Sequence, residues 1–125
     1  VQRIGDFAVR GLSRMAGQDP VSIPDTEVSF EDLRARLKAA RAAVWALPTA
    51  AIDADPSADI TFPAGPGKEM TLPRHAFVQN DMLANVLFHA PMAYATWRCI
   101  GVTPAKPDFH GRPALPHPRR TLHLL

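Results

Sequence analysis

Between Arg74 and Gly101 the sequence reads RHAFVQNDMLANVLFHAPMAYATWRCIG, and its apolar residues recur with the period of an α-helix. At about 100° per residue, one line down this helix carries Val78, Met82, Asn85, His89, Ala93, Thr96 and Ile100. Asn85 and His89 are four residues apart, so their side chains lie one above the other in the middle of that line. The segment therefore predicts one long helix whose buried face carries a polar pair.

A second helical period runs from Val1 to Gly17. Its apolar stripe consists of Val1, Ile4, Ala8, Gly11, Leu12 and Met15. The opposite side carries Gln2, Arg3, Asp6, Arg10 and Ser13. Asp6 and Arg10 are spaced as an i,i+4 ion pair. The pattern predicts an amphipathic helix with its charged side chains in water.

A third helical period runs from Ser29 to Leu47. Its apolar positions are Phe30, Leu33, Leu37, Ala40, Val44 and Leu47. Ser29 and Asp32 resemble a capping box at the helix start. Asp32 and Arg36 are spaced as an ion pair on the exposed side, and Pro48 ends the helix. We expect the three helices to pack near-antiparallel.

The segment from Asp59 to Leu72 has a different period. Apolar residues alternate with polar ones at Ile60, Phe62, Met70 and Leu72, and PAGPG lies between the two pairs. This pattern predicts a short β-hairpin. Pro73 suits the first turn of the long helix that follows, and Gly101 suits its end. The predicted fold class is all-α, with one small β-hairpin before the last long helix.

Length and composition indicate how the chain is organised into domains. The 125 residues are 46% hydrophobic and 21% charged, which is typical of one globular domain, and the formal net charge of +2 is too small to indicate nucleic acid binding. We expect this domain to span residues 1–111 and to be followed by a proline-rich basic tail, 112–125, that is loosely held or disordered. No apolar run approaches the ~20 residues of a membrane span, and the single Cys99 excludes an internal disulfide. These features predict a cytoplasmic protein that does not enter a membrane.

Seven short motifs follow one another at fixed spacings. They are Asp6-Phe7-Ala8, Arg14-x-Ala16-Gly17, Glu27-x-x-Phe30-x-x-Leu33, Asn85-x-x-x-His89, Ala93-Tyr94-Ala95, Arg98-x-x-Gly101-Val102 and Lys106-x-Asp108-Phe109-x-Gly111. In these motifs the chain resembles the bacterial domain-of-unknown-function family numbered 1993, a branch of the DinB-like four-helix bundles. The resemblance covers Val1 to Gly111. Two positions depart from it: Pro91 stands where the family usually has Val or Thr, and His110 where Leu is usual.

The resemblance implies a DinB-like helical bundle in which three of the four helices are present, because the family begins with another helix before the one at Val1. A bundle without that helix would expose an apolar groove for a ligand or a second copy to fill, so we expect a homo-oligomer, most simply a dimer. Relatives in the superfamily include metal-dependent thiol-handling enzymes in which three histidines hold a divalent ion. Here Ala93 stands four residues after His89, and His75 lies roughly 21 Å from His89 along the helix. The metal triad is not reproduced, and we expect no bound metal or other cofactor.

Three interpretations of Asn85 and His89 stay open. They can be a structural pair that fixes helix register, or they can line a pocket with Asp81 above and Tyr94 or Thr96 below. In the third, His89 is a metal ligand. The first two predict a non-catalytic module that binds a small molecule or a subunit. The alternative is a degenerate DinB-like metal-dependent enzyme that uses His89 as a base or metal ligand, so enzyme activity stays open.

Overall fold

The computed structural model describes residues 1–110 of the chain. The chain divides into two compact units, Val1–Pro91 and Met92–Leu125, and each is described by itself. The predicted tail, 112–125, lies outside the described residues. Within residues 1–110, no helix is both long enough and apolar enough to cross a membrane.

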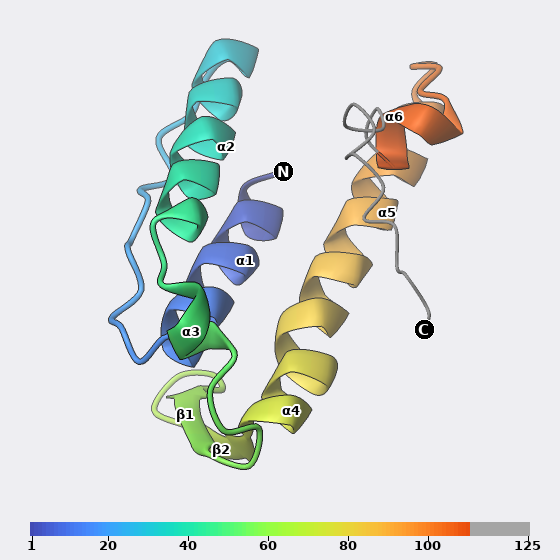
Figure 1. The fold of residues 1–125 in the computed structure, drawn as a ribbon. Coiled ribbons are helices and arrows are strands. Elements are labelled where there is room, and N and C mark those ends of the chain that lie inside the picture. Colours follow the sequence, from blue (N-terminus) through green and yellow to red (C-terminus); the bar gives the residue numbers. More distant parts are fainter. Residues whose placement is uncertain (111–125) are drawn as a thin grey trace, which may run out of the picture. The chain divides into compact units, whose positions relative to one another are not determined.

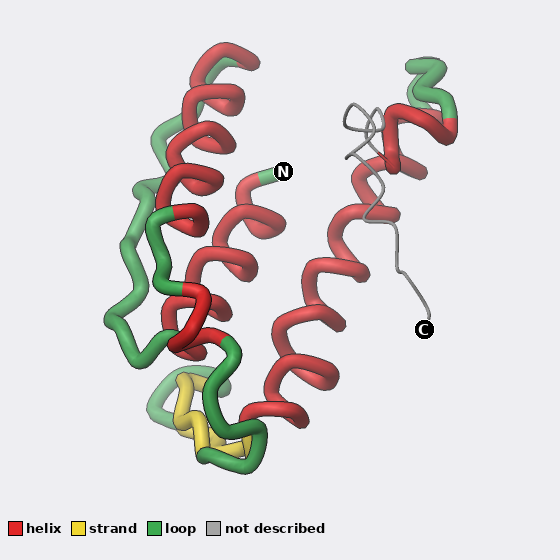
Figure 2. Tube along the Cα trace, viewed as in Figure 1, coloured by secondary structure: helices red, strands yellow, loops and turns green. Residues whose placement is uncertain are grey.

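The first unit contains most of the secondary structure (Figure 1). In chain order it holds α1 (Gln2–Met15), α2 (Phe30–Trp45), α3 (Thr49–Ile52), β1 (Asp59–Pro63), β2 (Glu69–Pro73), α4 (Arg74–Phe77), η1 (Val78–Met82) and the start of α5 (Leu83–Cys99). The second unit holds the rest of α5 and α6 (Lys106–His110). Figure 2 shows mostly helix with a short strand region, and within residues 1–110 the two strands form one antiparallel hairpin, so the predicted fold class is confirmed.

Helices α1 and α2 lie side by side and run parallel (Figure 1). A Cβ added at Gly5, near the start of α1, would lie 3.4 Å from the Cβ of Ala40 in α2. At the other end of α1, the guanidinium of Arg74 donates to the carbonyl of Met15 and also to that of Ala51, which follows α2. The predicted antiparallel packing is therefore wrong for this pair. The connection between them can run back along both helices because extended chain spans ~3.3 Å per residue and a helix only ~1.5 Å.

The core of the first unit lies where the end of α1 meets the hairpin and the α4–η1 segment. Its buried members are Met15, Ile60, Phe62, Phe77 and Met82. Phe77 is fully buried, and its ring meets the edge of Phe62 at a centroid distance of 4.9 Å. In the antiparallel hairpin Ile60 pairs with Leu72, so Ile60 and Phe62 face the core on alternate positions as predicted. Met70 faces solvent instead.

The predicted long helix is present but is not uniform. After α4 the chain makes a π-helical turn, η1, before α5 continues to Cys99. A π turn holds about one more residue than an α turn, so positions beyond it rotate away from the line expected for a straight α-helix. Met82 is buried, whereas Thr96 is exposed and Ile100 is 70% exposed. The predicted single buried line is therefore wrong in its second half.

Two predictions about charged faces are also wrong. Asp6 and Ser13 were expected in water but are 6% and 3% exposed, and Asp6 pairs with Arg36 rather than with Arg10. Asp32 does not pair with Arg36, because its carboxylate accepts from the backbone N–H of Ser29 in the predicted capping box. The helical period predicts exposed positions for charged residues, but the buried guanidinium of Arg36 holds Asp6 in the interior.

Candidate functional site

The five residues predicted to line an inner polar pocket are divided between the two units. Asp81, Asn85 and His89 belong to the first unit, while Tyr94 and Thr96 belong to the second. The Tyr94 hydroxyl donates to the carbonyl of Pro104 at 3.0 Å, which ties the segment after α5 to that helix. The Thr96 hydroxyl donates to the carbonyl of Met92, one turn earlier, at 2.8 Å. Both hydroxyls therefore have local structural partners.

Asn85 and His89 do not bond to each other. The Asn85 amide donates to the backbone carbonyl of Asp81 at 2.8 Å and, more weakly, to its carboxylate at 3.4 Å. The His89 ring stacks on Phe7 of α1 with a centroid distance of 5.6 Å and an interplanar angle of 19°. Its edge meets Phe88 at 5.3 Å. Within residues 1–110, His89 is thus an aromatic packing partner whose neighbour, Phe7, lines the pocket described next.

A pocket of about 150 Å³ lies between α1, β1 and η1. Its lining residues are Phe7, Arg10, Gly11, Arg14, Phe62, Pro63 and Asp81. The walls approach closely at Gly11, where an added Cβ would lie 2.4 Å from Cγ of Met82. Glycine is therefore required at this crossing, and the pocket forms beside it. Of the five predicted site residues, only Asp81 lines this pocket.

The charges of the pocket are incompletely paired. Arg10 and Arg14 are one helical turn apart, and within residues 1–110 neither guanidinium forms an ion pair or hydrogen bond. Burial lowers the pKa of Arg14, and the neighbouring positive charge of Arg10 lowers it further. Burial raises the pKa of the Asp81 carboxyl, while Arg14 opposes that shift. The pocket therefore has two cationic groups and one carboxylate.

The π turn accounts for the position of Asp81. Asp81 and Met82 are consecutive in η1, and the first lines the pocket while the second is 8% exposed in the core. π turns occur frequently at functional sites, because the extra residue changes which side chains face a neighbouring element. The sequence patterns do not identify Phe7, Arg10 or Arg14 as site residues. The signal for them is the pair of arginines one turn apart on α1, of which the helical period places Arg10 on the solvent-facing side.

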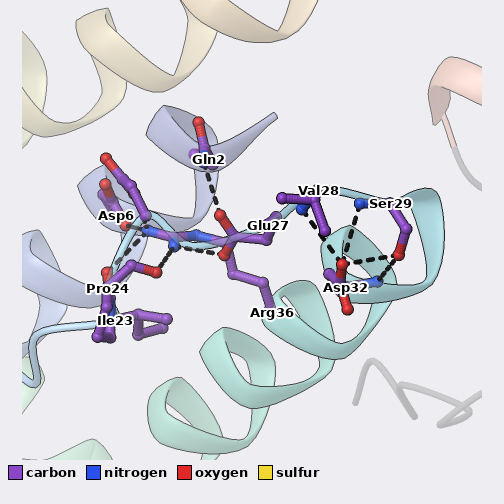
Figure 3. Close-up of polar contacts among 10 residues, drawn as sticks. Gln2, Asp6, Ile23, Pro24, Glu27, Val28, Ser29, Asp32 and Arg36 are labelled. Atoms are coloured by element: carbon purple, nitrogen blue, oxygen red, sulfur yellow. Dashed lines mark hydrogen bonds and ion pairs between the residues drawn. The ribbon is translucent and has the colours of Figure 1, made fainter.

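A second polar cluster surrounds Arg36 (Figure 3): both terminal guanidinium nitrogens are paired, while the buried Nε has no hydrogen-bond partner within residues 1–110. Arg36 is 4% exposed, and its guanidinium donates to Asp6 at 2.6 Å and to Glu27 at 2.7 Å. Asp25 lies 2.9 Å away, and the carbonyls of Ile23 and Pro24 accept at 3.1 and 2.7 Å. Gln2 donates to the second oxygen of Glu27 at 2.6 Å. These contacts fasten the connection between α1 and α2 onto both helices.

A transition-metal site needs three or four side chains that converge on one ion. Within residues 1–110, no three His, Cys, Asp or Glu side chains are grouped so as to hold an ion. The Nδ1–H of His75 donates to the carbonyl of Pro56 at 3.1 Å, and His75 is remote in sequence from His89. His117 and His123 lie outside the described residues. His89 as a lone metal ligand remains a prediction.

The fold and the pocket define a helical-bundle domain with a β-hairpin ahead of its last long helix. Residues 1–110 match the sequence model of a domain of unknown function, DUF1993, and the chain belongs to this family. The resemblance that the motifs carry is confirmed.

A solved structure agrees with this assignment. The chain is similar to a DinB family member from Shewanella denitrificans, with a TM-score of 0.78 and 27% sequence identity. The similarity covers 94% of this chain and 65% of that structure, so the chain spans less than two thirds of its relative's length. Among proteins of curated function, none matches the chain.

Proposed function

We propose that the chain is a non-catalytic small-molecule-binding module, with its ligand site in the pocket between α1, β1 and η1. The observation that carries this proposal is that Arg10 and Arg14 line a pocket of about 150 Å³ without side-chain partners in residues 1–110. A cavity of this volume accommodates a molecule of roughly benzene size. Ligand sites typically combine apolar and aromatic walls with a few convergent polar groups, as Phe7 and Phe62 do here with Arg10 and Arg14.

A fragment screen tests the proposal. Compounds of up to about ten heavy atoms would be screened against the ¹⁵N-labelled chain. We expect hits to shift the amide resonances of Phe7, Gly11 and Asp81, and to leave those of Ser29 and Leu33 unchanged. A screen without hits, or hits that map only to α2, would contradict the proposal.

Metal content separates this proposal from the enzyme alternative, in which His89 is a base or metal ligand. A single imidazole does not hold zinc or nickel tightly, because such sites need three or four ligands. We expect the protein purified without chelator to contain far less than one zinc or nickel per chain. A stoichiometric metal measured by elemental analysis would favour the enzyme and count against a purely binding role.

We further propose that the chain forms a homo-oligomer and acts in the bacterial cytoplasm. Leu87 and Phe88 of α5 are 61% and 62% exposed, and exposed large apolar side chains in succession favour association. Cys99 is an exposed free thiol, which fits a reducing compartment. Sedimentation at micromolar concentration should give a dimer that Leu87→Ser weakens. A monomer under these conditions would contradict self-association.

A further inference from the structure

Arg36 and the pocket arginines, Arg10 and Arg14, lie in different surroundings, and the contrast bears on what the pocket binds. Arg36 is nearly inaccessible and has carboxylates of Asp6, Asp25 and Glu27 within 2.9 Å. The buried guanidinium of Arg36 therefore has more carboxylates around it than one positive charge requires. Arg10 and Arg14 lack such partners among residues 1–110. A ligand that enters the pocket can therefore supply the missing partner for these two guanidinium groups.

The geometry points to a small oxyanion as the ligand of this pocket, a carboxylate or phosphate bound by Arg10 and Arg14, with its apolar body against Phe7 and Phe62. This inference rests on the proposed function of the pocket as a ligand site. Residues four apart on a helix present their side chains to one side, so both guanidinium groups can reach one anionic group. Guanidinium matches the planar geometry of carboxylate and phosphate with two parallel hydrogen bonds.

The charge balance of the pocket favours an anion. Among residues 1–110, Asp81 is the one carboxylate that lines it, against the guanidinium groups of Arg10 and Arg14. Burial lowers the pKa of Arg14 and raises that of Asp81, so neither ionised group is optimally stabilised in its present surroundings. A bound anion would stabilise both arginines in their charged form. Asp81 remains as an acceptor for a hydroxyl or amino group on the same ligand.

The walls of the pocket limit the size of the apolar part of the ligand. Phe7 and Phe62 supply aromatic surface, and Gly11 brings the backbone of α1 close to the pocket. The stack of His89 on Phe7, at 5.6 Å, helps to hold that ring in position. A volume of about 150 Å³ admits one aromatic ring or a short aliphatic chain besides the anionic group. Benzoate is therefore a suitable probe.

A set of probes that differ mainly in charge tests the inference. Benzoate, benzamide and benzamidinium share one ring, and their binding to the full chain would be followed by amide shifts at Phe7, Gly11 and Asp81. We expect benzoate to bind at least about tenfold more tightly than benzamide, because charge-assisted hydrogen bonds are roughly twice as strong as neutral ones. Benzamidinium should not bind.

Variants then assign the effect to the arginines. Arg10→Gln and Arg14→Gln should each weaken benzoate binding by about tenfold or more, whereas Asp81→Asn should strengthen it by removing a like charge. Arg3→Gln is the matched control on the same helix, since Arg3 is exposed and does not line the pocket. Circular dichroism of each variant would verify folding before titration. Equal losses in Arg3→Gln and Arg14→Gln would overturn the inference.

The remaining outcomes are decisive as well. Equal binding of benzoate and benzamide would keep the pocket as a ligand site but overturn the oxyanion. Preference for benzamidinium would also overturn the oxyanion, and it would mean that the Asp81 carboxylate determines which ligands bind. Inorganic phosphate distinguishes the two oxyanion classes: competition with benzoate supports a phosphate ligand, and its absence supports a carboxylate. If none of these four probes binds, the oxyanion inference fails, while the fragment screen decides the proposed function separately.

Discussion

In the first unit, the surroundings of Arg36 differ from those of Arg10 and Arg14 in how the positive charge is paired. The side chain of Arg36 is almost inaccessible to water, and its guanidinium donates hydrogen bonds to the carboxylates of Asp6 and Glu27. Around Arg10 and Arg14 the surface is hollowed, and within residues 1–110 no carboxylate is in ion-pair contact with either. The first arrangement joins distant segments of the chain through carboxylates that already pair the guanidinium. The second keeps two guanidinium groups without such partners within residues 1–110.

The largest expected effect is on Arg36. Arg36→Met leaves the carboxylates of Asp6 and Glu27 close together without their cation, and breaking a buried pair from one side costs about 3–5 kcal/mol. Because 1 kcal/mol moves the midpoint by roughly 3–6 °C in a domain of this size, a thermal melt should fall by at least about 9 °C. The matched control is Arg34→Met, whose side chain is 76% exposed on the same helix. A loss no larger than in that control would mean that the cluster is not structural.

Acid should weaken the same cluster. The hydrogen bonds donated by Arg36 and Gln2 lower the pKa of Glu27 from 4.5 to about 2. A carboxyl with a lower pKa in the folded state stabilises the protein above its unfolded pKa, and this contribution is lost as pH falls through the folded pKa. Urea unfolding at several pH values should therefore show stability falling between pH 4.5 and 2. The decline should be shallower in Glu27→Gln and unchanged in the exposed control Glu31→Gln.

A third prediction concerns the wall of the pocket. Gly11→Ala would put a Cβ 2.4 Å from Cγ and 3.2 Å from Cβ of Met82, so the buried Met82 side chain must shift or the crossing of α1 with η1 must open. Overpacking of this kind costs about 1–3 kcal/mol. Gly5→Ala is the matched control, because its Cβ would lie 3.4 Å from the Cβ of Ala40 and alanine favours helix by ~1 kcal/mol. Equal melting temperatures of the two variants would argue against the close crossing.

A smaller effect is expected at His89. His89→Ala removes the stack on Phe7 and the edge contact with Phe88, and such aromatic pairs contribute about 0.5–1.5 kcal/mol. The Asn85 amide keeps its acceptor at Asp81, so no buried donor is left without a partner. His89→Phe should retain most of the stability. A loss above about 3 kcal/mol in the alanine variant would indicate a buried hydrogen bond of the imidazole.

The smallest effect should come from Arg14. Arg14→Gln breaks no ion pair within residues 1–110 and removes the repulsion from Arg10, so the free energy of unfolding should change by less than about 0.5 kcal/mol. Thermal melts of this variant and of Arg36→Met, measured side by side, compare the two regions directly. A loss of several kcal/mol at Arg14 would make the pocket arginines structural and remove the contrast.

Local sequence determined much of the secondary structure. The capping box at Ser29 and Asp32, the alternation at Ile60 and Phe62, and the helical periods all depend on residues close together in the chain, and these predictions are confirmed. The spaced motifs also identified the family correctly. Each of these signals can be evaluated without knowing which distant segment lies opposite.

Tertiary structure decided which charges are buried and where the pocket lies. Asp6 meets Arg36 across 30 positions of sequence, and that pairing makes burial of both favourable although each alone would stay in water. The π turn at Val78–Met82 redirects Asp81 toward α1, which α-helical periodicity does not anticipate. The candidate site therefore exists only where α1, β1 and η1 come together, because none of these elements alone encloses a volume or brings Asp81 to Arg14.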